Sequence, residues 1–387
     1  MSNRRITYKW YIQLCMIAVA LCGCIAMLFN DGDIADNGGS VYRYAYLATF
    51  MISIPGAILY YIRPAYNTSK RLFRLVWMLF MWIALITILY NKSNLNGLIF
   101  NLTNVLMPLS IMHCTYYFVQ KYGYKKESIA FTAFVMMLLL LIQYLGIYNI
   151  SESHLISSYY PLFLLPLVLL HPSKIIRYSS IILVTVAIFS SLKRGGLIAL
   201  VAGLIIYLIC YRRVGSQKKG IFIYTILALC VLGGIFYYLA STEYTEIIER
   251  LMNIQEDEGS GRTDVWATTW QMISDSEFFP YILGHGNNAV WNDSPLDLSA
   301  HNDFLEAWYD FGFIGFAFYV LMLLSLLRYT IQLIRNKSSY APSMAMLLTI
   351  TLILTMISHV LIYYFINFVC LTIAITSGYI DNNERNE

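Results

Sequence analysis

The chain has 387 residues, of which 58% are hydrophobic and only 12% charged, with a net charge of +4 and a mean hydropathy of +0.60. A soluble domain carries about 25% charged residues and no repeated apolar runs of about 20 residues, so this composition excludes a soluble globular protein. The seven cysteines lie in apolar runs and form no CxxC pair, which argues against a disulfide framework or a cysteine metal site. The composition therefore indicates a multi-pass membrane protein.

Continuous apolar runs predict an all-α fold, because backbone groups in lipid must form their hydrogen bonds within the segment. A transmembrane barrel would instead show short alternating segments. Twelve spans are predicted: 10–29, 44–62, 72–90, 98–119, 128–148, 155–170, 175–192, 195–211, 220–240, 311–334, 342–358 and 362–380.

Lysine and arginine in the short loops predict the orientation of these spans. One set of connections, together with both termini, holds 20 of the 26 basic residues, whereas the other set is acidic or nearly neutral. The basic set is therefore placed in the cytoplasm, with both termini. The chain divides into spans one to nine in 1–240, an outer loop in 241–310, and spans ten to twelve with a short cytoplasmic tail in 311–387.

The outer loop has a distinct composition. It holds 14 of the 22 acidic residues, four of the seven tryptophans and only two basic residues, Arg250 and Arg262. Within it, a helix is predicted to start near Arg262, capped by Ser260 or Thr263. Free N–H groups and a guanidinium there would form an anion site. The alternative is that Arg262 pairs with Asp264 or another acid of the loop.

The turn between spans seven and eight breaks the charge pattern. Lys193 and Arg194, followed by Gly195 and Gly196, lie on the predicted outer face, where basic residues are disfavoured. A cation that breaks the pattern at a membrane surface is a candidate functional residue. The alternative is an interfacial pair whose side chains reach back to water. The residue pattern alone favours neither interpretation.

His301 lies just before the tenth span, with Ser299 or Asn302 as the predicted helix cap. Asp303 and Glu306 follow on that helix. A histidine at the outer surface can act as a base near neutral pH, although a lone histidine is more often structural. No two of the six histidines have ligand spacing on one helix, so no metal site is predicted.

Two further features are predicted to serve packing. Asn101 and Asn104 share a face near the outer end of the fourth span, where bonding to neighbouring helices is favoured over the lining of a polar cavity. The turn with Gly284 and Gly286 is not a dinucleotide motif, because no strand precedes it. Its glycines are expected to allow close backbone packing.

Three local motifs in this topology resemble those of the O-antigen polymerase and ligase superfamily of bacterial inner-membrane glycosyltransferases. The motifs are Ser191-Leu192-Lys193-Arg194-Gly195-Gly196-Leu197, Gly261-Arg262-Thr263-Asp264-Val265-Trp266, and Ala300-His301-Asn302-Asp303-Phe304-Leu305-Glu306 followed by Gly312 and Gly315. The chain departs from the family pattern at Lys193, where a serine or threonine is usual. Arg194 aligns with the family arginine and is favoured over Lys193 as the phosphate ligand.

The resemblance implies a GT-C-like fold and inverting, metal-independent transfer from an undecaprenyl-pyrophosphate-linked glycan donor, without a cofactor. Arg194 and Arg262, with Lys193 as a further candidate, would hold the pyrophosphate, and His301 would orient or deprotonate the acceptor hydroxyl.

Asn302, Asp303 and Glu306 would support His301 or the acceptor sugar. The implied partners are the lipid-linked donor and acceptor, membrane lipids, a chain-length regulator and a flippase. No nucleic acid is expected.

Within this resemblance the polymerase branch is favoured, and a ligase that transfers the glycan to lipid A-core is the alternative. A transporter or flippase of lipid-linked oligosaccharide would be expected to bury charges in mid-span and to show repeats. A receptor with an acidic sensor loop would need no arginine at the 193–196 turn.

Overall fold

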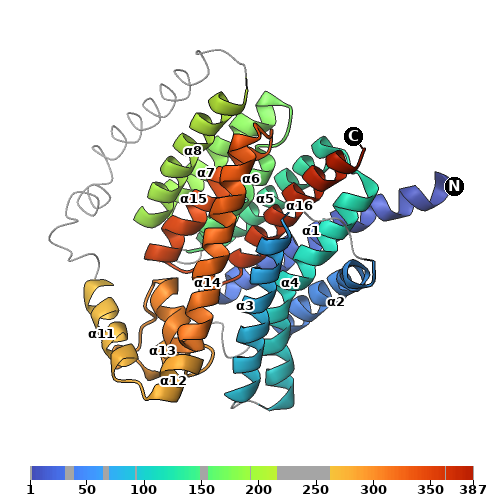
Figure 1. The fold of residues 1–387 in the computed structure, drawn as a ribbon. Coiled ribbons are helices and arrows are strands. Elements are labelled where there is room, and N and C mark those ends of the chain that lie inside the picture. The colour runs from blue at the N-terminus through green and yellow to red at the C-terminus, as the bar shows by residue number, and fades with distance from the viewer. Residues whose placement is uncertain are drawn as a thin grey trace, which may run out of the picture.

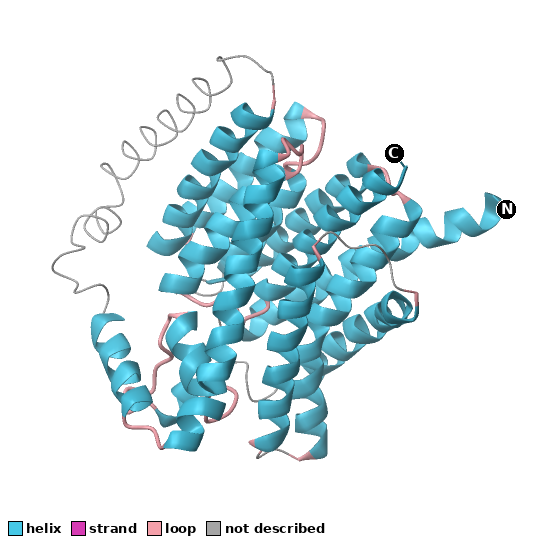
Figure 2. Ribbon diagram, viewed as in Figure 1, coloured by secondary structure: helices cyan, strands magenta, loops and turns pink. Residues whose placement is uncertain are grey.

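The computed structural model describes residues 2–30, 39–63, 69–91, 94–148, 156–191, 193–215, 262–361 and 363–386. These residues form only helices and loops, as Figure 2 shows, so the predicted all-α fold is confirmed for them. A helix covers each predicted span that the described residues include. The ninth predicted span, 220–240, and most of the first part of the outer loop lie outside the described residues.

The helices are named in chain order. They are α1 (Ser2–Asn30), α2 (Gly39–Ile62), α3 (Lys70–Leu89), α4 (Leu95–Tyr122), α5 (Lys126–Tyr148), the short 3-10 helix η2 (Ile156–Ser158), α6 (Tyr159–Val168), α7 (Lys174–Ser190), α8 (Arg194–Val214), α11 (Arg262–Ser274), α12 (Phe278–Leu283), α13 (Ala289–Asp293), α14 (Asp303–Arg335), α15 (Ala341–Ile357) and α16 (Phe365–Asn386).

Seven of the described helices are long and apolar enough to cross a membrane: α1 to α5, α8 and α14. Large apolar side chains remain exposed on the outside of the bundle, such as Ile142, Ile175 and Val186. Exposed apolar surface on this scale is unfavourable in water and expected in lipid. The chain is therefore a multi-pass membrane protein, and the full count of twelve spans stays a prediction.

The core of the bundle surrounds the short helix α6. All ten residues of α6 are buried, and α6 packs against α5, α7 and α16. Around it, α2 and α16 pack on α4, α15 packs on α8, and α14 packs on α3 (Figure 1). The turns that carry the candidate residues gather at one end of the bundle, where α11, α12 and α13 lie beside the start of α14.

The long helix α14 is broken at Gly312, which has φ 69° and ψ 179°. This left-handed conformation favours glycine, because a Cβ atom is strained there. A Cβ on Gly312 would also overlap the carbonyl group of Ile282, and one on Gly284 would overlap the carbonyl of Asp310. The two glycines therefore let the end of α12 meet the break in α14, which confirms the predicted close packing at Gly284.

The carbonyl groups that precede the break accept hydrogen bonds from outside the helix. Tyr309 O accepts from His285 N–H at 3.0 Å, and Asp310 O accepts from Gly286 N–H at 2.9 Å. Phe311 O accepts from the indole Nε1–H of Trp82 on α3 at 2.8 Å. Because buried carbonyl groups need partners, these three bonds attach the outer segment and α3 to α14 at one fixed position.

Replacement of Gly312 by Ala is expected to destabilise the protein by about 1–3 kcal/mol, because it adds a Cβ to a strained and fully packed position. Thermal unfolding in detergent, followed by tryptophan fluorescence, should show a Tm several degrees below the wild type. Gly146→Ala in α5 is the matched control, since a Cβ there meets nothing within 4 Å and alanine favours helix. Equal Tm values for the two variants would show that the break is not required.

Candidate active site

The α7–α8 turn lies against α6. Gly195 and Gly196 are buried, and a Cβ on Gly196 would lie 2.6 Å from the ring of Tyr159. The absence of side chains therefore lets the start of α8 approach α6 closely. Lys193 is the N-cap residue of α8 and Arg194 its first residue, and both are half-buried. The turn is thus held within the protein and not only at a lipid interface.

Arg262 is the first described residue of α11, which confirms a helix in this segment. Thr263 lies within the helix, so it is not the cap, and Ser260 lies outside the described residues. Trp266, one turn later, donates from Nε1 to the carbonyl of Ala300 at 2.8 Å, and Trp270 packs edge-on against Trp308. These contacts attach α11 beside His301. Within the described part of the chain, Arg262 makes no ion pair, so the expected alternative of an Arg262–Asp264 pair does not hold there.

His301 lies directly before α14 in the left-handed region, with φ 49°. Non-glycine residues adopt this conformation infrequently, and such strain tends to occur at functional positions. Asn302 is the N-cap of α14, and its side-chain Oδ1 accepts from the N–H groups of Phe304 and Leu305 at 3.0 and 3.4 Å. The cap fixes the start of the helix and, with it, the position of the His301 ring.

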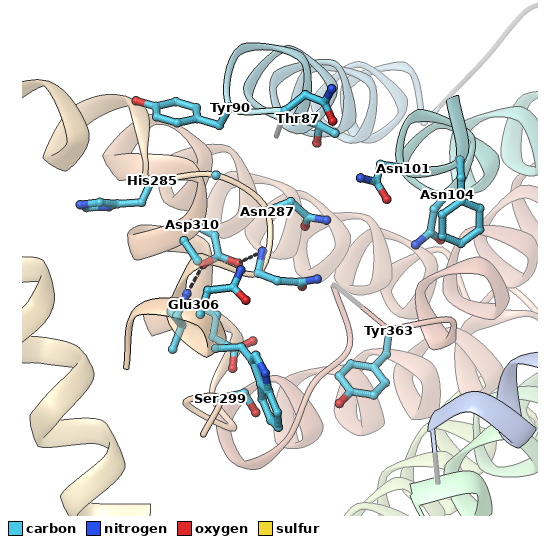
Figure 3. Close-up of a pocket in the computed structure, with 18 of the residues that line it drawn as sticks. Thr87, Tyr90, Asn101, Asn104, His285, Asn287, Ser299, Glu306, Asp310 and Tyr363 are labelled. Atoms are coloured by element: carbon cyan, nitrogen blue, oxygen red, sulfur yellow. Dashed lines mark hydrogen bonds between the residues drawn. The ribbon is translucent and has the colours of Figure 1, made fainter. Parts of the chain in front are cut away.

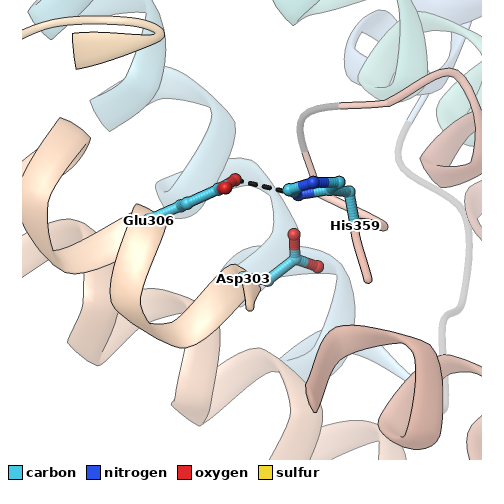
Figure 4. Close-up of side chains that lie close together, drawn as sticks. All are labelled: Asp303, Glu306 and His359. Atoms are coloured by element: carbon cyan, nitrogen blue, oxygen red, sulfur yellow. Dashed lines mark ion pairs between the residues drawn. The ribbon is translucent and has the colours of Figure 1, made fainter. Parts of the chain in front are cut away.

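The His301 ring contacts a second histidine that the sequence analysis did not select. His359 lies in the loop between α15 and α16 and is fully buried. Its Nε2 is 2.9 Å from Nδ1 of His301, and its Nδ1 is 3.0 Å from Oε2 of Glu306 (Figure 4). The second contact has an ion-pair distance but not the angle of a hydrogen bond. His301, His359 and Glu306 thus form a continuous row, and Ser299 Oγ contacts His359 Nε2 at 3.2 Å.

Asp303 holds the loop that carries His359. Its Oδ2 accepts from the backbone N–H groups of Val360 and Leu361 at 2.8 and 3.0 Å. The same oxygen accepts from the hydroxyl of Tyr319 at 2.9 Å. Removal of this carboxylate would leave buried donors unpaired, which costs about 1–3 kcal/mol for each group. Asp303 therefore supports His301 indirectly, by positioning His359.

Both histidines of the row are neutral at physiological pH. Burial lowers the pKa of His301 to about 3, and the nearby His359, Arg262 and Lys193 act in the same direction. Burial also lowers the pKa of His359 to about 4; Asp303 opposes this shift and Arg262 adds to it. A protonated ring is disfavoured here because it would be poorly solvated and close to cations. The site is a neutral histidine pair beside the basic side chains of Lys193 and Arg262.

Asp303, Glu306 and His359 also form the cluster among the described residues that could hold a metal ion, with ligand atoms within 4.8 Å of one another. Oδ2 of Asp303 accepts three hydrogen bonds, and Nε2 of His359 contacts His301. Oδ1 of Asp303, both carboxylate oxygens of Glu306 and Nδ1 of His359 form no hydrogen bond with the described residues. The cluster therefore keeps buried donor atoms without a protein partner.

A polar cavity of about 760 Å³ begins on the Glu306 side of this row (Figure 3). It lies between the ends of α2, α3 and α4 and the turn before α13, and Glu306 and Ser299 form part of its wall. Asp310 holds the wall of the cavity that α13 forms, because its carboxylate accepts from Asn288 N–H at 3.0 Å and Val290 N–H at 2.9 Å. Asn101 and Asn104 line this cavity, so the packing role favoured from the sequence was wrong.

Comparison with known families decides which chemistry this site belongs to. Residues 179–320 match the family model described as O-antigen ligase. The chain contains an O-antigen ligase family domain. The match includes Lys193, Arg194, Arg262, His301 and Glu306. The search of curated proteins finds no match.

The family performs glycan transfer of the O-antigen ligase and polymerase type, with lipid-linked glycan substrates, in the bacterial inner membrane. A domain of this family implies a glycosyltransferase-type enzyme. His359 lies outside the matched segment. As a lone histidine between two apolar runs, it had no sequence signal that could have singled it out.

The structure brings most of the predicted residues of the O-antigen ligase domain together. Lys193 and Arg262 both lie close enough to His301 to lower its pKa, and Glu306 reaches it through His359. Arg194 follows the residue that caps α8. The preference for Arg194 over Lys193 as the phosphate ligand stays a prediction.

The electrostatics of the domain can be tested by a titration of His301. In the detergent-solubilised protein labelled at histidine, NMR should find a His301 pKa of about 3, assigned by its loss in His301→Gln. Arg262→Gln should raise this pKa, because removal of a nearby positive charge makes the protonated ring less unfavourable. Arg335→Gln, at the other end of α14, should leave it unchanged. A His301 pKa near the ordinary 6.5 in the wild type would contradict the buried, cation-flanked geometry.

Proposed function

We propose that this chain polymerises undecaprenyl-pyrophosphate-linked repeat units into O-antigen, or a related surface polysaccharide, on the periplasmic face of the inner membrane. The observation that carries the proposal is the neutral His301–His359 pair placed beside Lys193 and Arg262 in a membrane protein with an O-antigen ligase family domain. These groups suit a substrate that combines a pyrophosphate with a sugar hydroxyl.

The basic side chains hold the pyrophosphate of the donor. Guanidinium groups bind phosphate oxygens with two parallel hydrogen bonds, and Arg262 has no carboxylate partner among the described residues. Lys193 approaches the same region from the α7–α8 turn, and Arg194 is retained as a second ligand from that turn. When the bond to the sugar breaks, negative charge grows on the leaving pyrophosphate, and fixed cations stabilise it.

The transfer itself is a single displacement. The acceptor hydroxyl oxygen attacks the anomeric carbon of the donor from the side opposite the pyrophosphate, which inverts that carbon. The new bond joins the acceptor oxygen to the anomeric carbon, and the bond between that carbon and the pyrophosphate oxygen breaks with its electron pair. The products are the extended glycan and undecaprenyl pyrophosphate. The hydroxyl proton leaves to Nε2 of His301.

His301 alone would be a weak base, because its pKa of about 3 is far from neutral pH. The row offers a route by which the proton can leave His301. If Nε2 of His301 takes the hydroxyl proton, its Nδ1 proton can pass to Nε2 of His359. The Nδ1 proton of His359 then passes to Glu306, which must enter this step as a carboxylate. No charged imidazole forms beside the cations, and the buried Glu306 carboxylate is neutralised. Catalytic contacts often tighten only when substrate is bound. We expect the Glu306–His359 contact to become a hydrogen bond in this way.

A second function of the same chemistry is an O-antigen ligase, which transfers the finished glycan to lipid A-core. The description of the matched family model favours it. The polymerase is proposed on the resemblance of the sequence motifs alone. A flippase is disfavoured by the position of the basic side chains, which gather at the ends of α8 and α11, whereas a transport path needs charges in mid-span.

Deletion of the gene separates these functions. Lipopolysaccharide gels should show lipid A-core with a single repeat unit if the chain is the polymerase, because ligation still occurs. Bare core with accumulated lipid-linked polymer would identify a ligase instead. Loss of a capsule or exopolysaccharide without a change in lipopolysaccharide would assign the polymerase to that glycan. If every gel shows unchanged glycan, the proposal is wrong.

Point variants test the site in the same assay. His301→Ala and Arg262→Ala should each abolish polymer, since they remove the proton acceptor and a pyrophosphate ligand. Arg335→Ala is the matched control, because Arg335 is exposed at the far end of α14. All variants should be present in the membrane at wild-type levels by immunoblot. Normal polymer in the His301 variant would refute its assigned role.

The row can be tested with purified protein and lipid-linked repeat units. His359→Gln and Glu306→Gln should lower kcat by roughly 10²–10⁴-fold, the usual contribution of a positioned acid–base group, with the KM for donor little changed. Glu306→Asp should restore part of the rate, because it keeps a carboxylate. The control is His171→Gln in the α6–α7 loop, at the opposite end of α7 from Lys193. A higher KM with an unchanged kcat would show that the row binds donor and does not move protons.

A further inference from the structure

We infer that the cavity between α2, α3, α4 and the turn before α13 binds the acceptor glycan. This inference rests on the proposed function and deepens it, because it separates a sugar site from the pyrophosphate site. The volume of about 760 Å³ lies within the range of about 300–1,000 Å³ that is usual for ligand sites. A cavity of this size accepts a short oligosaccharide and excludes a long folded partner.

The side chains that line the cavity suit sugar hydroxyl groups. Asn101 and Asn104 enter from α4 and Asn287 from the turn before α13 (Figure 3). Among the described residues, none of these three amides has a hydrogen-bond partner within the protein. Each amide offers both donors and an acceptor, as each sugar hydroxyl does. Three partly buried amides left open toward one cavity are expected to bind a polar, uncharged ligand.

Aromatic rings supply the second kind of contact. Tyr90 from α3, Tyr363 from the loop before α16 and Trp291 from α13 line the same cavity. Rings with a polar tip combine a flat apolar face with a hydrogen-bonding group. The apolar faces of pyranose rings can pack on such side chains while their hydroxyls reach the amides. This combination is unusual for a purely lipid-facing surface.

The cavity lining lacks the cations that a pyrophosphate needs. Among the described lining residues there is no lysine or arginine. Arg43 is not one of them, and its guanidinium carbon lies 5.6 Å from the ring centroid of Phe100. A pyrophosphate would therefore find no cationic partner in this lining. The cations that act on His301 belong to Lys193 and Arg262, and neither lines the cavity.

The position of Glu306 assigns the cavity to the acceptor and not to the donor. The first sugar of the donor is bonded to the pyrophosphate and must lie beside the cations. An acceptor needs only to present one hydroxyl to His301. Glu306 and Ser299 belong to the cavity wall, and both contact His359, which contacts His301. A glycan in the cavity therefore contacts the Glu306 end of the row, and its reacting hydroxyl must extend past this end to reach Nε2 of His301.

The inference is tested by calorimetric binding to the purified full chain in detergent. The probes are inorganic pyrophosphate and the single-repeat oligosaccharide, prepared by partial hydrolysis of the strain's own surface polysaccharide. Asn101→Ala/Asn104→Ala should raise the Kd for the oligosaccharide about 10- to 100-fold, the effect of two lost hydrogen bonds, and leave pyrophosphate binding unchanged. Arg262→Ala should do the reverse. Asn336→Ala, exposed at the far end of α14, should change neither.

Retained pyrophosphate binding shows that the double variant is folded. The wild type should bind both probes at the same time. Wild-type oligosaccharide affinity in the double variant, no oligosaccharide binding by the wild type, or competition between the two probes would each overturn the inference. These outcomes are independent of the proposed function, which fails instead if deletion of the gene leaves every surface glycan unchanged.

Discussion

The close contact between Gly312 and Gly284 is the constraint on which the geometry of the site depends. Helix α14 must be interrupted at Gly312 for the end of α12 to reach it, and only residues without a Cβ allow the two backbones to meet. The carbonyl groups before the break then bind the outer segment and Trp82. Without this break, α14 would continue as a straight helix, and Glu306 and Asp310 would be carried away from the loops that they contact.

Burial, more than any single charge, sets the chemistry of the site. An exposed histidine between two cations would still titrate near neutral pH, but His301 and His359 are shielded from water and remain neutral. The cations can therefore lie close to a proton acceptor without a competing positive charge. Asp303 holds the buried loop that carries His359, because its carboxylate accepts from the backbone N–H groups of Val360 and Leu361.

The row of His301, His359 and Glu306 contacts two groups of side chains of different character. Lys193 and Arg262 act on His301, whereas Glu306 lines a cavity of amides, rings and acids that includes neither cation. A transfer between a pyrophosphate-linked sugar and a hydroxyl needs both groups, since the leaving group requires positive charge and the incoming hydroxyl requires a proton acceptor. The arrangement explains why several acids of the outer segment are buried beside the site and are not exposed on its surface.

The amino-acid sequence by itself determined the membrane class and the apolar helices that the described residues contain, because apolar runs act over short stretches of the chain. It also selected Lys193 and Arg194, since their charge breaks the pattern of the short loops, whereas Arg262, His301 and Glu306 were selected from the outer loop and the motif resemblance.

Only the tertiary structure decided which candidates meet. His359 contacts His301 although the two residues are 58 positions apart in the chain. Among the described residues, Asn104 lines a cavity and does not bond a neighbouring helix. Such contacts depend on how distant helices pack, and no local pattern of residues records that.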